Sequence, residues 1–254
     1  MPKGRRGTEP LLLPQESGDG VLPRCRIMIL GVGGAGNRVI SRLVEDSLAG
    51  ADCVAINTDL HDLNCVIGAR KVLIGENVTR GLGAGGKPEV GKAAAKESES
   101  YLNELLEDVD VVFVVAGLGG GTGTGAAPTV AEVARRKGAA VVGVVTKPLK
   151  TERGRVGRAT HALSEMRRAS DTVVVIDANK IHAGAKYLPS SEVFKVADRI
   201  SANMIKGLVE TLSSPSLVNL NFVDFKTVIR RGGMAVVGVG ESRAPNRAEE
   251  AVRN

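Results

Sequence analysis

Glycine clusters that follow short aliphatic runs constrain the fold of this chain more than any other feature. The sequence contains 32 glycines in 254 residues, and the densest groups lie at residues 31–36, 81–86 and 117–125. Each group comes directly or shortly after a run rich in Val, Ile, Leu or Ala. Glycine permits positive φ angles and close approach of neighbouring backbone, so such groups form tight turns. The pattern predicts several strands that end in glycine turns.

Aliphatic runs alternate with helical stretches from Arg24 onward, which is the rhythm of a parallel α/β sheet. Helices are expected over Pro88–Leu106 and Pro128–Lys137. Aromatic residues make up only 2% of the chain, so the core must be aliphatic, as in a parallel sheet buried on both faces. We predict a doubly wound parallel sheet of the α/β class, which binds ligands outside the carboxyl ends of its strands. The expected strands are Cys25–Leu30, Cys53–Asn57, Lys71–Ile74, Val109–Ala116, Ala140–Thr146 and Thr172–Asp177.

A long amphipathic helix is predicted over Ser191–Leu212. A short strand at Leu217–Phe222, a further helix, and a strand at Gly233–Gly240 should follow it. One strand and the start of a helix do not make a domain, so we expect an incomplete second α+β domain. The apolar residues that recur at three- and four-residue steps along the long helix are Val193, Val196, Ala197, Ile200, Met204 and Leu208.

Two of the glycine turns indicate a phosphate site. Residues 31–37 satisfy G-x-G-x-x-G at a strand-to-helix turn, where backbone N–H groups and the helix dipole favour an anion. Alone, this motif also fits a Rossmann dinucleotide site with Asp59 as the ribose acid. Residues 117–125 add a second turn with Thr122 and Thr124, whose hydroxyls can bind phosphate or the shell of a magnesium ion. Several converging turns suit a triphosphate, and the sequence has no P-loop motif G-x-x-x-x-G-K-[ST].

Charge and cysteine content narrow the possible partners and the cellular location. The net charge is +6, but Lys and Arg are spread along the chain without an aromatic platform, so no nucleic-acid partner is expected. Cys25, Cys53 and Cys65 have neither paired nor metal-ligand spacing, which fits free thiols in a reducing cytoplasm. The sequence shows no bilayer-spanning apolar run and no signal peptide, so no direct membrane insertion is expected.

The sequence GGGTGTG at residues 119–125 resembles the signature of the tubulin/FtsZ family. The segments GVGGAGN at 31–37, NTD at 57–59 and GLGAGG at 81–86 make the chain similar to FtsZ, most of all to archaeal forms. The resemblance implies GTP and GDP binding with Mg²⁺, GTP hydrolysis, and head-to-tail assembly into cytoskeletal filaments for cell division and septation. Its implied partners are further copies of the chain and possible other division proteins.

The resemblance also divides the chain into three parts. We expect a flexible N-terminal tail over residues 1–23 and a GTP-binding domain with the central helix over 24–212. Residues 213–254 would hold the synergy-loop region and the start of a truncated C-terminal domain.

Family resemblance assigns guanine contacts to Asn37, Asn179, Phe194 and Asp198. Phe194 and Asp198 are four residues apart near the start of the long helix, hence on one face. The ring could stack on the purine while the carboxylate accepts hydrogen bonds from guanine N1 and N2. Adenine lacks those two donors, so Asp198 would set the specificity for guanine.

Residues 147–152 resemble the ribose loop of the family, with Glu152 as the ribose contact. Arg155 is the expected basic residue, in preference to Arg158. The Mg²⁺ ion is expected to be held mainly by GTP phosphates and water, without protein ligands. The implied nucleotide contacts are Gly33, Gly34, Ala35, Gly36, Asn37, Asp59, Ala84, Gly85, Gly86, Gly120, Gly121, Thr122, Gly123, Thr124, Glu152, Arg155, Asn179, Phe194 and Asp198.

Residues 219–224, NLNFVD, resemble the synergy loop N-x-D-x-x-D, with Asn221 in place of the first aspartate and Asp224 as the second. A carboxylate can polarise an attacking water, whereas an amide can orient it but cannot take up its proton. Slow hydrolysis is therefore expected. The long helix should span about 33 Å at about 1.5 Å per residue, so Asp224 would reach the nucleotide of the next subunit rather than its own.

Two other functions remain open from the sequence. A Rossmann-type NAD(P) oxidoreductase would need a substrate domain with an acid or base for hydride chemistry, and none is recognisable. A GTP-binding regulator that neither polymerises nor turns over is compatible with the incomplete second domain and with Asn221.

Overall fold

The computed structural model describes residues 25–213, 222–230, 246 and 249. The predicted tail over residues 1–23 and the predicted strand Gly233–Gly240 lie outside these residues, as does Asn221. The predicted strand Leu217–Phe222 lies outside them except for Phe222, which begins a helix.

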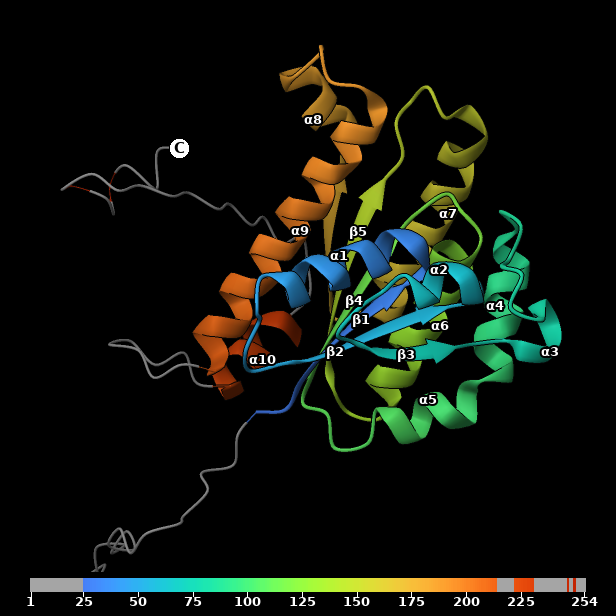
Figure 1. The fold of residues 1–254 in the computed structure, drawn as a ribbon. Coiled ribbons are helices and arrows are strands. Elements are labelled where there is room, and N and C mark those ends of the chain that lie inside the picture. Colours follow the sequence, from blue (N-terminus) through green and yellow to red (C-terminus); the bar gives the residue numbers. More distant parts are fainter. Residues whose placement is uncertain (1–24, 214–221, 231–245, 247–248, 250–254) are drawn as a thin grey trace, which may run out of the picture.

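Six parallel strands form one sheet in the order β3-β2-β1-β4-β5-β6 (Figure 1). The doubly wound α/β fold is therefore confirmed, and each predicted strand lies within two residues of its observed bounds. In the register, Leu30 of β1 is paired with Val54 of β2 on one side and with Val114 of β4 on the other. The strands are β1 Ile27–Val32, β2 Asp52–Asn57, β3 Arg70–Leu73, β4 Val111–Gly117, β5 Ala140–Lys147 and β6 Thr172–Asp177.

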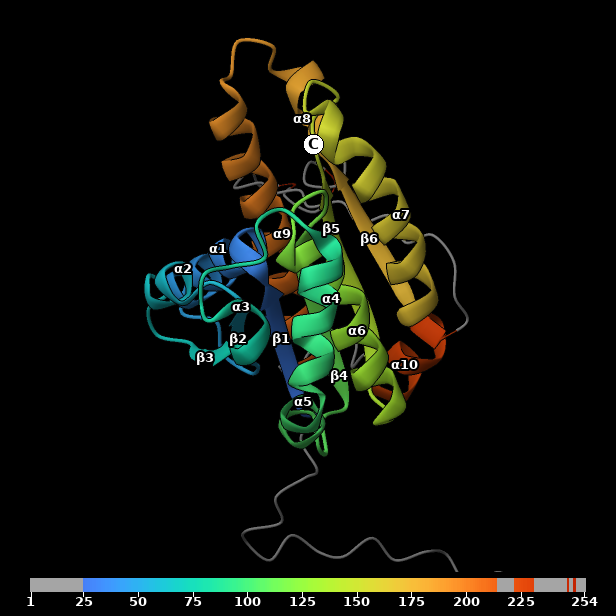
Figure 2. The ribbon, with the colours of Figure 1, turned by 90° about the vertical axis from the view of Figure 1, so that its right-hand side faces the viewer.

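Helices cover both faces of the sheet (Figure 2). Alternate residues of β1 serve the two cores, because Ile29 packs with the cluster on one face and Leu30 with the cluster on the other. Helices α1 (Gly33–Glu45), α9 (Ser190–Ser213) and α10 (Phe222–Arg230) cover the Ile29 face; α4 (Pro88–Glu97), α5 (Glu99–Leu105), α6 (Thr122–Arg136) and α7 (Arg153–Ala169) cover the other. Short helices α2 (Leu60–Asn64), α3 (Glu76–Thr79) and α8 (Ala178–Gly184) lie in the connections.

Two helix boundaries differ from the prediction. The helix expected over Pro88–Leu106 is broken at Ser98, whose hydroxyl oxygen accepts a hydrogen bond from the Gly75 N–H at 3.0 Å. Helix α6 begins at Thr122, inside the glycine turn, and Pro128 lies within the helix. The start of α6 packs backbone to backbone against α4, since a Cβ on Gly91 of α4 would lie 2.7 Å from the Gly121 carbonyl oxygen. This packing stabilises a helix start in which the glycines alone would disfavour helix.

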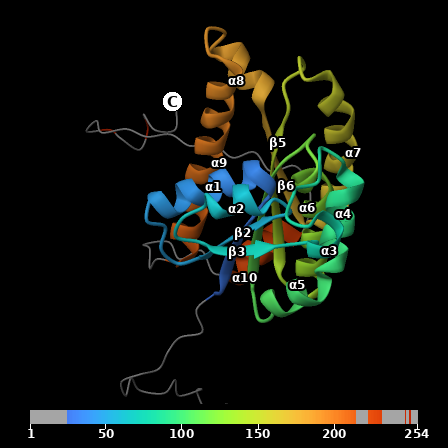
Figure 3. The same cartoon turned by 45° about the vertical axis from the view of Figure 1, so that its right-hand side comes forward.

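Helix α9 is the longest helix of the described chain, with 24 residues, or about 36 Å at about 1.5 Å per residue. The prediction over Ser191–Leu212 is confirmed to within one residue at each end. The helix lies beside α1 and runs from the level of α8 toward the opposite end of the sheet (Figure 3). None of the described helices combines the length and the apolar character needed to cross a bilayer.

Candidate nucleotide-binding site

A cavity of about 250 Å³ opens at the carboxyl ends of the central strands. It lies where the strand order reverses between β1 and β4, which is the usual ligand position in a doubly wound sheet. The turns after β1, β4 and β5 and one face of α9 form its walls. The lining residues are Val32, Gly33, Gly34, Ala35, Arg38, Gly117, Leu118, Gly120, Gly121, Thr122, Gly123, Thr146, Pro148, Glu152, Arg155, Phe194 and Asp198.

The glycine turns after β1 and β4 are in direct contact. Gly33 has a φ of +73°, and a Cβ on it would lie 2.8 Å from the backbone nitrogen of Gly123. A Cβ on Gly117 would lie 2.6 Å from the Cβ of Ala35. A side chain at either glycine would push the two turns apart. The turns therefore form one continuous wall, and their direct contact agrees with the prediction that the glycine turns converge.

The third glycine turn stands next to this wall rather than inside the cavity. A Cβ on Gly121 would lie 2.8 Å from the Ala84 Cβ and 3.2 Å from the Gly86 nitrogen. Gly85 and Gly86 have φ angles of +58° and +73° and face open space, so backbone conformation and not crowding favours glycine there. Ala84, Gly85 and Gly86 thus adjoin the wall without lining the cavity.

Two helices begin at this wall without a cap. Neither Val32 before α1 nor Gly121 before α6 makes a side-chain hydrogen bond to the first turn, and neither first turn contains an acidic residue. The first N–H groups of a helix have no partner within it, and they carry the positive end of the helix dipole. Two such ends in one cavity wall make a site for the negative oxygens of a phosphate chain.

The two threonines of the second glycine turn have different places. Thr122 lines the cavity, and its hydroxyl oxygen lies 2.6 Å from that of Thr58, which follows β2. Thr124 is buried, and its hydroxyl oxygen accepts a hydrogen bond from the Gly119 N–H at 2.8 Å. Thr124 and Gly36 do not line the cavity. Thr124 therefore holds the turn in shape.

Phe194 and Asp198 of α9 form the end of the cavity away from the glycine wall, together with Arg38 of α1. The Nε of Arg38 donates to the Oδ2 of Asp198 at 2.8 Å, and the Asp198 side chain is only 8% exposed. Burial raises the pKa of Asp198 above its usual value, although the charges of Arg38 and Arg42 act against this shift. The packing of α1 beside α9 is a tertiary contact with no signal in the local sequence pattern, so the sequence does not predict Arg38 as a site residue.

Asn37 is buried next to Arg38 and does not line the cavity. Its amide nitrogen and oxygen both lack a hydrogen-bond partner. A buried amide without partners costs about 1–3 kcal/mol, so such groups in folded proteins usually have an explanation. A polar ligand in the adjoining cavity fits this observation, because it would bring hydrogen-bonding groups to the same end of α1.

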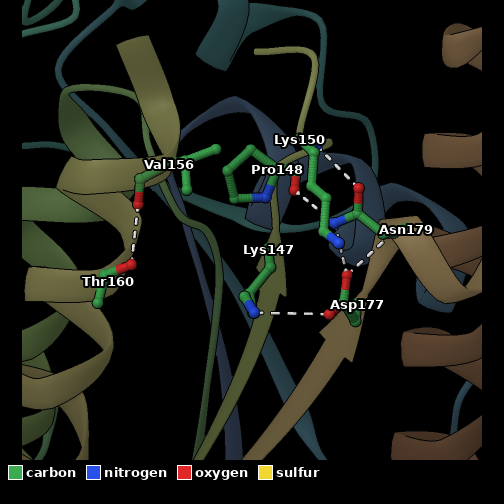
Figure 4. A network of polar contacts seen from close by, with 7 residues as sticks. All are labelled: Lys147, Pro148, Lys150, Val156, Thr160, Asp177 and Asn179. Carbon is green, nitrogen blue, oxygen red and sulfur yellow. Dashed lines mark hydrogen bonds and ion pairs between the residues drawn. The ribbon is translucent and has the colours of Figure 1, made fainter. Parts of the chain in front are cut away.

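Asn179 is not among the residues that line the cavity, and its contact with guanine stays a prediction. Its Nδ2 donates to the Pro148 carbonyl at 3.1 Å and to Asp177 Oδ1 at 2.8 Å, while its Oδ1 accepts from the Lys150 N–H at 2.8 Å (Figure 4). Both amide hydrogens are used within the protein. Asn179 instead anchors the loop after β5 to the end of β6.

Asp177 completes this anchor. Lys147 lies 3.5 Å from its Oδ2 (Figure 4). Burial acts to raise the pKa of Asp177, but the hydrogen bonds from Asn179 and the charge of Lys147 outweigh it and leave the pKa lowered. The ionised carboxylate is thus the form that holds the loop.

Glu152, the last residue of the anchored loop, and Arg155, in the first turn of α7, both line the cavity. Arg155 donates to Glu152 Oε1 at 2.8 Å, and the Leu149 N–H donates to Glu152 Oε2 at 3.1 Å. Arg158 points elsewhere, because its Nε donates to the Gly119 carbonyl at 3.0 Å. The choice of Arg155 over Arg158 therefore agrees with the geometry, while Arg158 supports the glycine turn.

Asp59 caps helix α2. Its side chain accepts hydrogen bonds from the backbone N–H groups of His61 and Asp62 at 3.0 and 3.1 Å, and it does not line the cavity. The ribose acid that a Rossmann site requires is therefore not placed at this cavity.

Asp224 lies at the other end of the sheet from the cavity. It is an exposed residue in the first turn of α10. Helix α10 is held there by Lys226 and Arg230, whose side chains donate to the carbonyl of Gly138, just before β5 begins. Figures 1–3 all show α10 and α8 at opposite ends of the sheet.

Residues 25–213 and 222–230 offer no cluster of three or more acidic, His or Cys side chains for a metal ion. At this cavity, hydroxyl groups such as that of Thr122 are the neutral oxygen ligands that the protein offers.

Comparison with protein families gives a match to the Tubulin/FtsZ family, GTPase domain, over residues 26–186. Among curated proteins, the chain is 50% identical over 224 residues to "Cell division protein FtsZ 2" of Methanocaldococcus jannaschii, covering 88% of this chain and 59% of that protein. It is 48% identical over 229 residues to "Cell division protein FtsZ 1" of Pyrococcus horikoshii, covering 90% and 62%. The chain thus spans about three fifths of the length of these relatives.

Solved structures give the same result. The M. jannaschii "FtsZ dimer, empty" superposes with a TM-score of 0.86 at 44% identity, covering 91% of this chain and 67% of that chain. CetZ2 from Haloferax volcanii, solved as a GTPγS-bound protofilament, has a TM-score of 0.71 at 26% identity, covering 82% and 64%.

Proposed function

The chain belongs to the Tubulin/FtsZ family, and we propose that it binds GTP and GDP in the cavity, hydrolyses GTP and assembles head to tail in cell division. One observation carries the proposal: two uncapped helix starts, at Gly33 and Thr122, meet in one wall of a cavity whose other end holds a buried carboxylate, Asp198. A phosphate chain and a base with hydrogen-bond donors satisfy both ends at once.

Phosphate binding depends on backbone groups in this proposal. The first N–H groups of α1 and α6 neutralise the negative oxygens, and the Thr122 hydroxyl donates to a phosphate or binds the ion that accompanies it. Thr122 is the residue whose hydroxyl would help hold Mg²⁺ beside the nucleotide, and the ion would supply charge neutralisation for phosphoryl transfer. Arg155 adds a positive charge beside the glycine turn after β4, because a Cβ on Gly119 would lie 2.7 Å from the Arg155 Cβ. From there, Arg155 and Glu152 face the sugar and phosphates.

Base recognition depends on α9. The ring of Phe194 stacks on the purine, and the carboxylate of Asp198 accepts hydrogen bonds from N1 and N2 of guanine. Adenine has no donor at these two positions. With adenine bound, the buried Asp198 carboxylate would accept no hydrogen bond from the base. An unsatisfied buried carboxylate costs more binding free energy than the hydrogen bond itself contributes.

Hydrolysis requires a second copy of the chain. Six residue steps separate Ala140 from Thr146 on β5, or about 20 Å at about 3.3 Å per residue. Asp224 belongs to the Ala140 end and the cavity to the Thr146 end, so Asp224 cannot act on the nucleotide of its own subunit. In a head-to-tail stack, Asp224 of one subunit faces the γ-phosphate of the next and positions the attacking water.

The relatives support assembly, since one solved structure is a dimer of FtsZ and another a protofilament of CetZ2. We expect the chain to act in the cytoplasm, with other division proteins as possible partners, and without nucleic-acid binding or membrane insertion. Asn221 stands where a second acid would assist Asp224, so turnover should be slow.

Nucleotide binding is the first test. Isothermal titration of the purified chain with GDP, ADP and NADH should give tight binding of GDP and weak or no binding of the other two. Tight NADH binding that GTP does not displace would reject the proposal in favour of a dinucleotide site.

Assembly is the second test. Light scattering and phosphate release after addition of GTP and Mg²⁺ should rise together above a critical protein concentration. Intact GDP binding without either signal would favour a regulator that does not polymerise.

A further inference from the structure

The ion pair between Arg38 and Asp198 joins two helices at the base end of the cavity. Arg38 comes from α1 and Asp198 from α9, and both line the cavity beside Phe194. The Asp198 side chain is 8% exposed and that of Arg38 is 56% exposed. The carboxylate is thus enclosed, while more than half of the surface of the Arg38 side chain remains exposed.

Arg38 has hydrogen-bond donors that its ion pair with Asp198 does not use. A guanidinium carries five N–H groups, and the bond to Asp198 uses the one on Nε. Within the described part of the chain, no acceptor is hydrogen-bonded to its two terminal amino groups. Because Nε is fixed on the carboxylate, the planar group has little freedom to turn, and its terminal amino groups stay beside Asp198.

The edge of guanine that meets Asp198 continues into an acceptor. N2 and N1 carry hydrogens, and the next atom in the row is the acceptor O6. A carboxylate beside a guanidinium matches this order, because the carboxylate accepts from N1 and N2 and the guanidinium donates to O6. Adenine has an amino donor in place of O6, so the same pair would set a donor against a donor.

We propose that Arg38 is a specificity-determining residue, which donates from its terminal amino groups to O6 of guanine while its Nε fixes the Asp198 carboxylate against N1 and N2. This inference rests on the proposed function, because it requires a guanine nucleotide in the cavity. In this proposal two residues recognise the base, Arg38 from α1 and Asp198 from α9.

Arg42 provides a matched control. It lies one turn further along α1, and its charge also acts on Asp198, but it does not line the cavity. Glu152 and Arg155 are the other charged residues of the cavity wall. Removing Arg38 or Arg42 takes away one positive charge near Asp198 in each case. Loss of Arg38 alone takes away a donor that can reach the base.

The test is equilibrium binding of three diphosphates to the wild-type chain, Arg38→Met and Arg42→Met by isothermal titration calorimetry. GDP carries O6, 6-thioguanosine diphosphate carries sulfur at this position, which is a weaker acceptor, and inosine diphosphate keeps O6 but lacks the N2 amino group. Arg38 and Arg42 lie on the surface side of α1, and circular dichroism with thermal unfolding checks that each variant is folded.

Wild type should bind GDP about tenfold more tightly than the 6-thio analogue, as expected for one charged hydrogen bond. Arg38→Met should bind the two about equally, and Arg42→Met should keep the wild-type preference. An Arg38→Met chain that still prefers GDP by the wild-type factor would overturn the proposal, as would equal loss of the preference in both variants.

The two levels of inference can fail separately. If the wild-type chain binds no GDP, the proposed function fails. If it binds GDP and prefers it to inosine diphosphate but does not distinguish the 6-thio analogue, Asp198 reads the base and Arg38 does not.

Discussion

Replacement of Gly33 by alanine should weaken the site by forcing the two phosphate turns apart. Two separate costs apply. The φ of +73° places the residue in the left-handed region, which costs a residue with a Cβ about 1–2 kcal/mol. The new Cβ would also lie 2.8 Å from the Gly123 nitrogen, and overpacking of this kind costs about 1–3 kcal/mol. The sum is about 2–5 kcal/mol of unfolding free energy.

Gly86→Ala separates these two costs. Gly86 has the same φ of +73°, but a Cβ there meets nothing within 4 Å. Urea unfolding of both variants without nucleotide should show Gly33→Ala to be less stable than Gly86→Ala by about 1–3 kcal/mol, the steric share alone. Calorimetric titration should show a weaker GDP affinity for Gly33→Ala than for wild type. Equal stabilities would show that the two turns move apart freely, and the view of a rigid phosphate wall would be wrong.

Three further predictions concern residues outside this wall. Asp224→Ala should bind GDP like wild type but release phosphate more slowly in the assembly assay; loss of GDP binding would contradict a catalytic role on the neighbouring subunit. Asn221→Asp should raise turnover per assembled subunit, and an unchanged or lower rate would count against the role given to that position. The lowered pKa of Asp177 means that its ionised form stabilises the fold above the usual aspartate pKa and that this contribution is lost as the pH falls through the lowered value. Asp177→Asn should therefore be less stable than wild type at neutral pH and should lose less stability on acidification; parallel urea midpoints from pH 7 to pH 3 would refute this.

Strand positions and the long helix followed directly from the sequence. The strands of the sheet are nearly continuous aliphatic runs, and α9 shows a regular apolar stripe, so local pattern was sufficient for both. The start of α6 was missed because local rules favour Pro128 near a helix start and disfavour glycine inside a helix. Its close packing on α4 is a tertiary contact, and the sequence pattern does not contain it.

The sequence predicts the site residues that belong to a motif and face the cavity. It does not predict those whose position depends on contact between segments far apart in the chain. Gly33, Gly123 and Asp198 line the cavity as expected. Asn179 and Thr124 have the right chemistry but make hydrogen bonds within the protein: Asn179 with Pro148, Lys150 and Asp177, and Thr124 as the acceptor of the Gly119 N–H. Arg38 was missed because its role depends on a helix 160 residues away in the chain.

The crossing of α4 and α6 has a consequence for how this protein can vary. A Cβ on Gly91 would lie 2.7 Å from the Gly121 carbonyl oxygen, and a Cβ on Gly125 would lie 1.9 Å from the Pro88 carbonyl oxygen, so backbone meets backbone at these two points. A Cβ at either glycine would meet backbone of the other helix, which cannot move aside by rotating a side chain, so the two helices would have to separate. Alanine at either position should therefore displace the start of α6, where Gly121 and Thr122 line the cavity, although neither Gly91 nor Gly125 lines it.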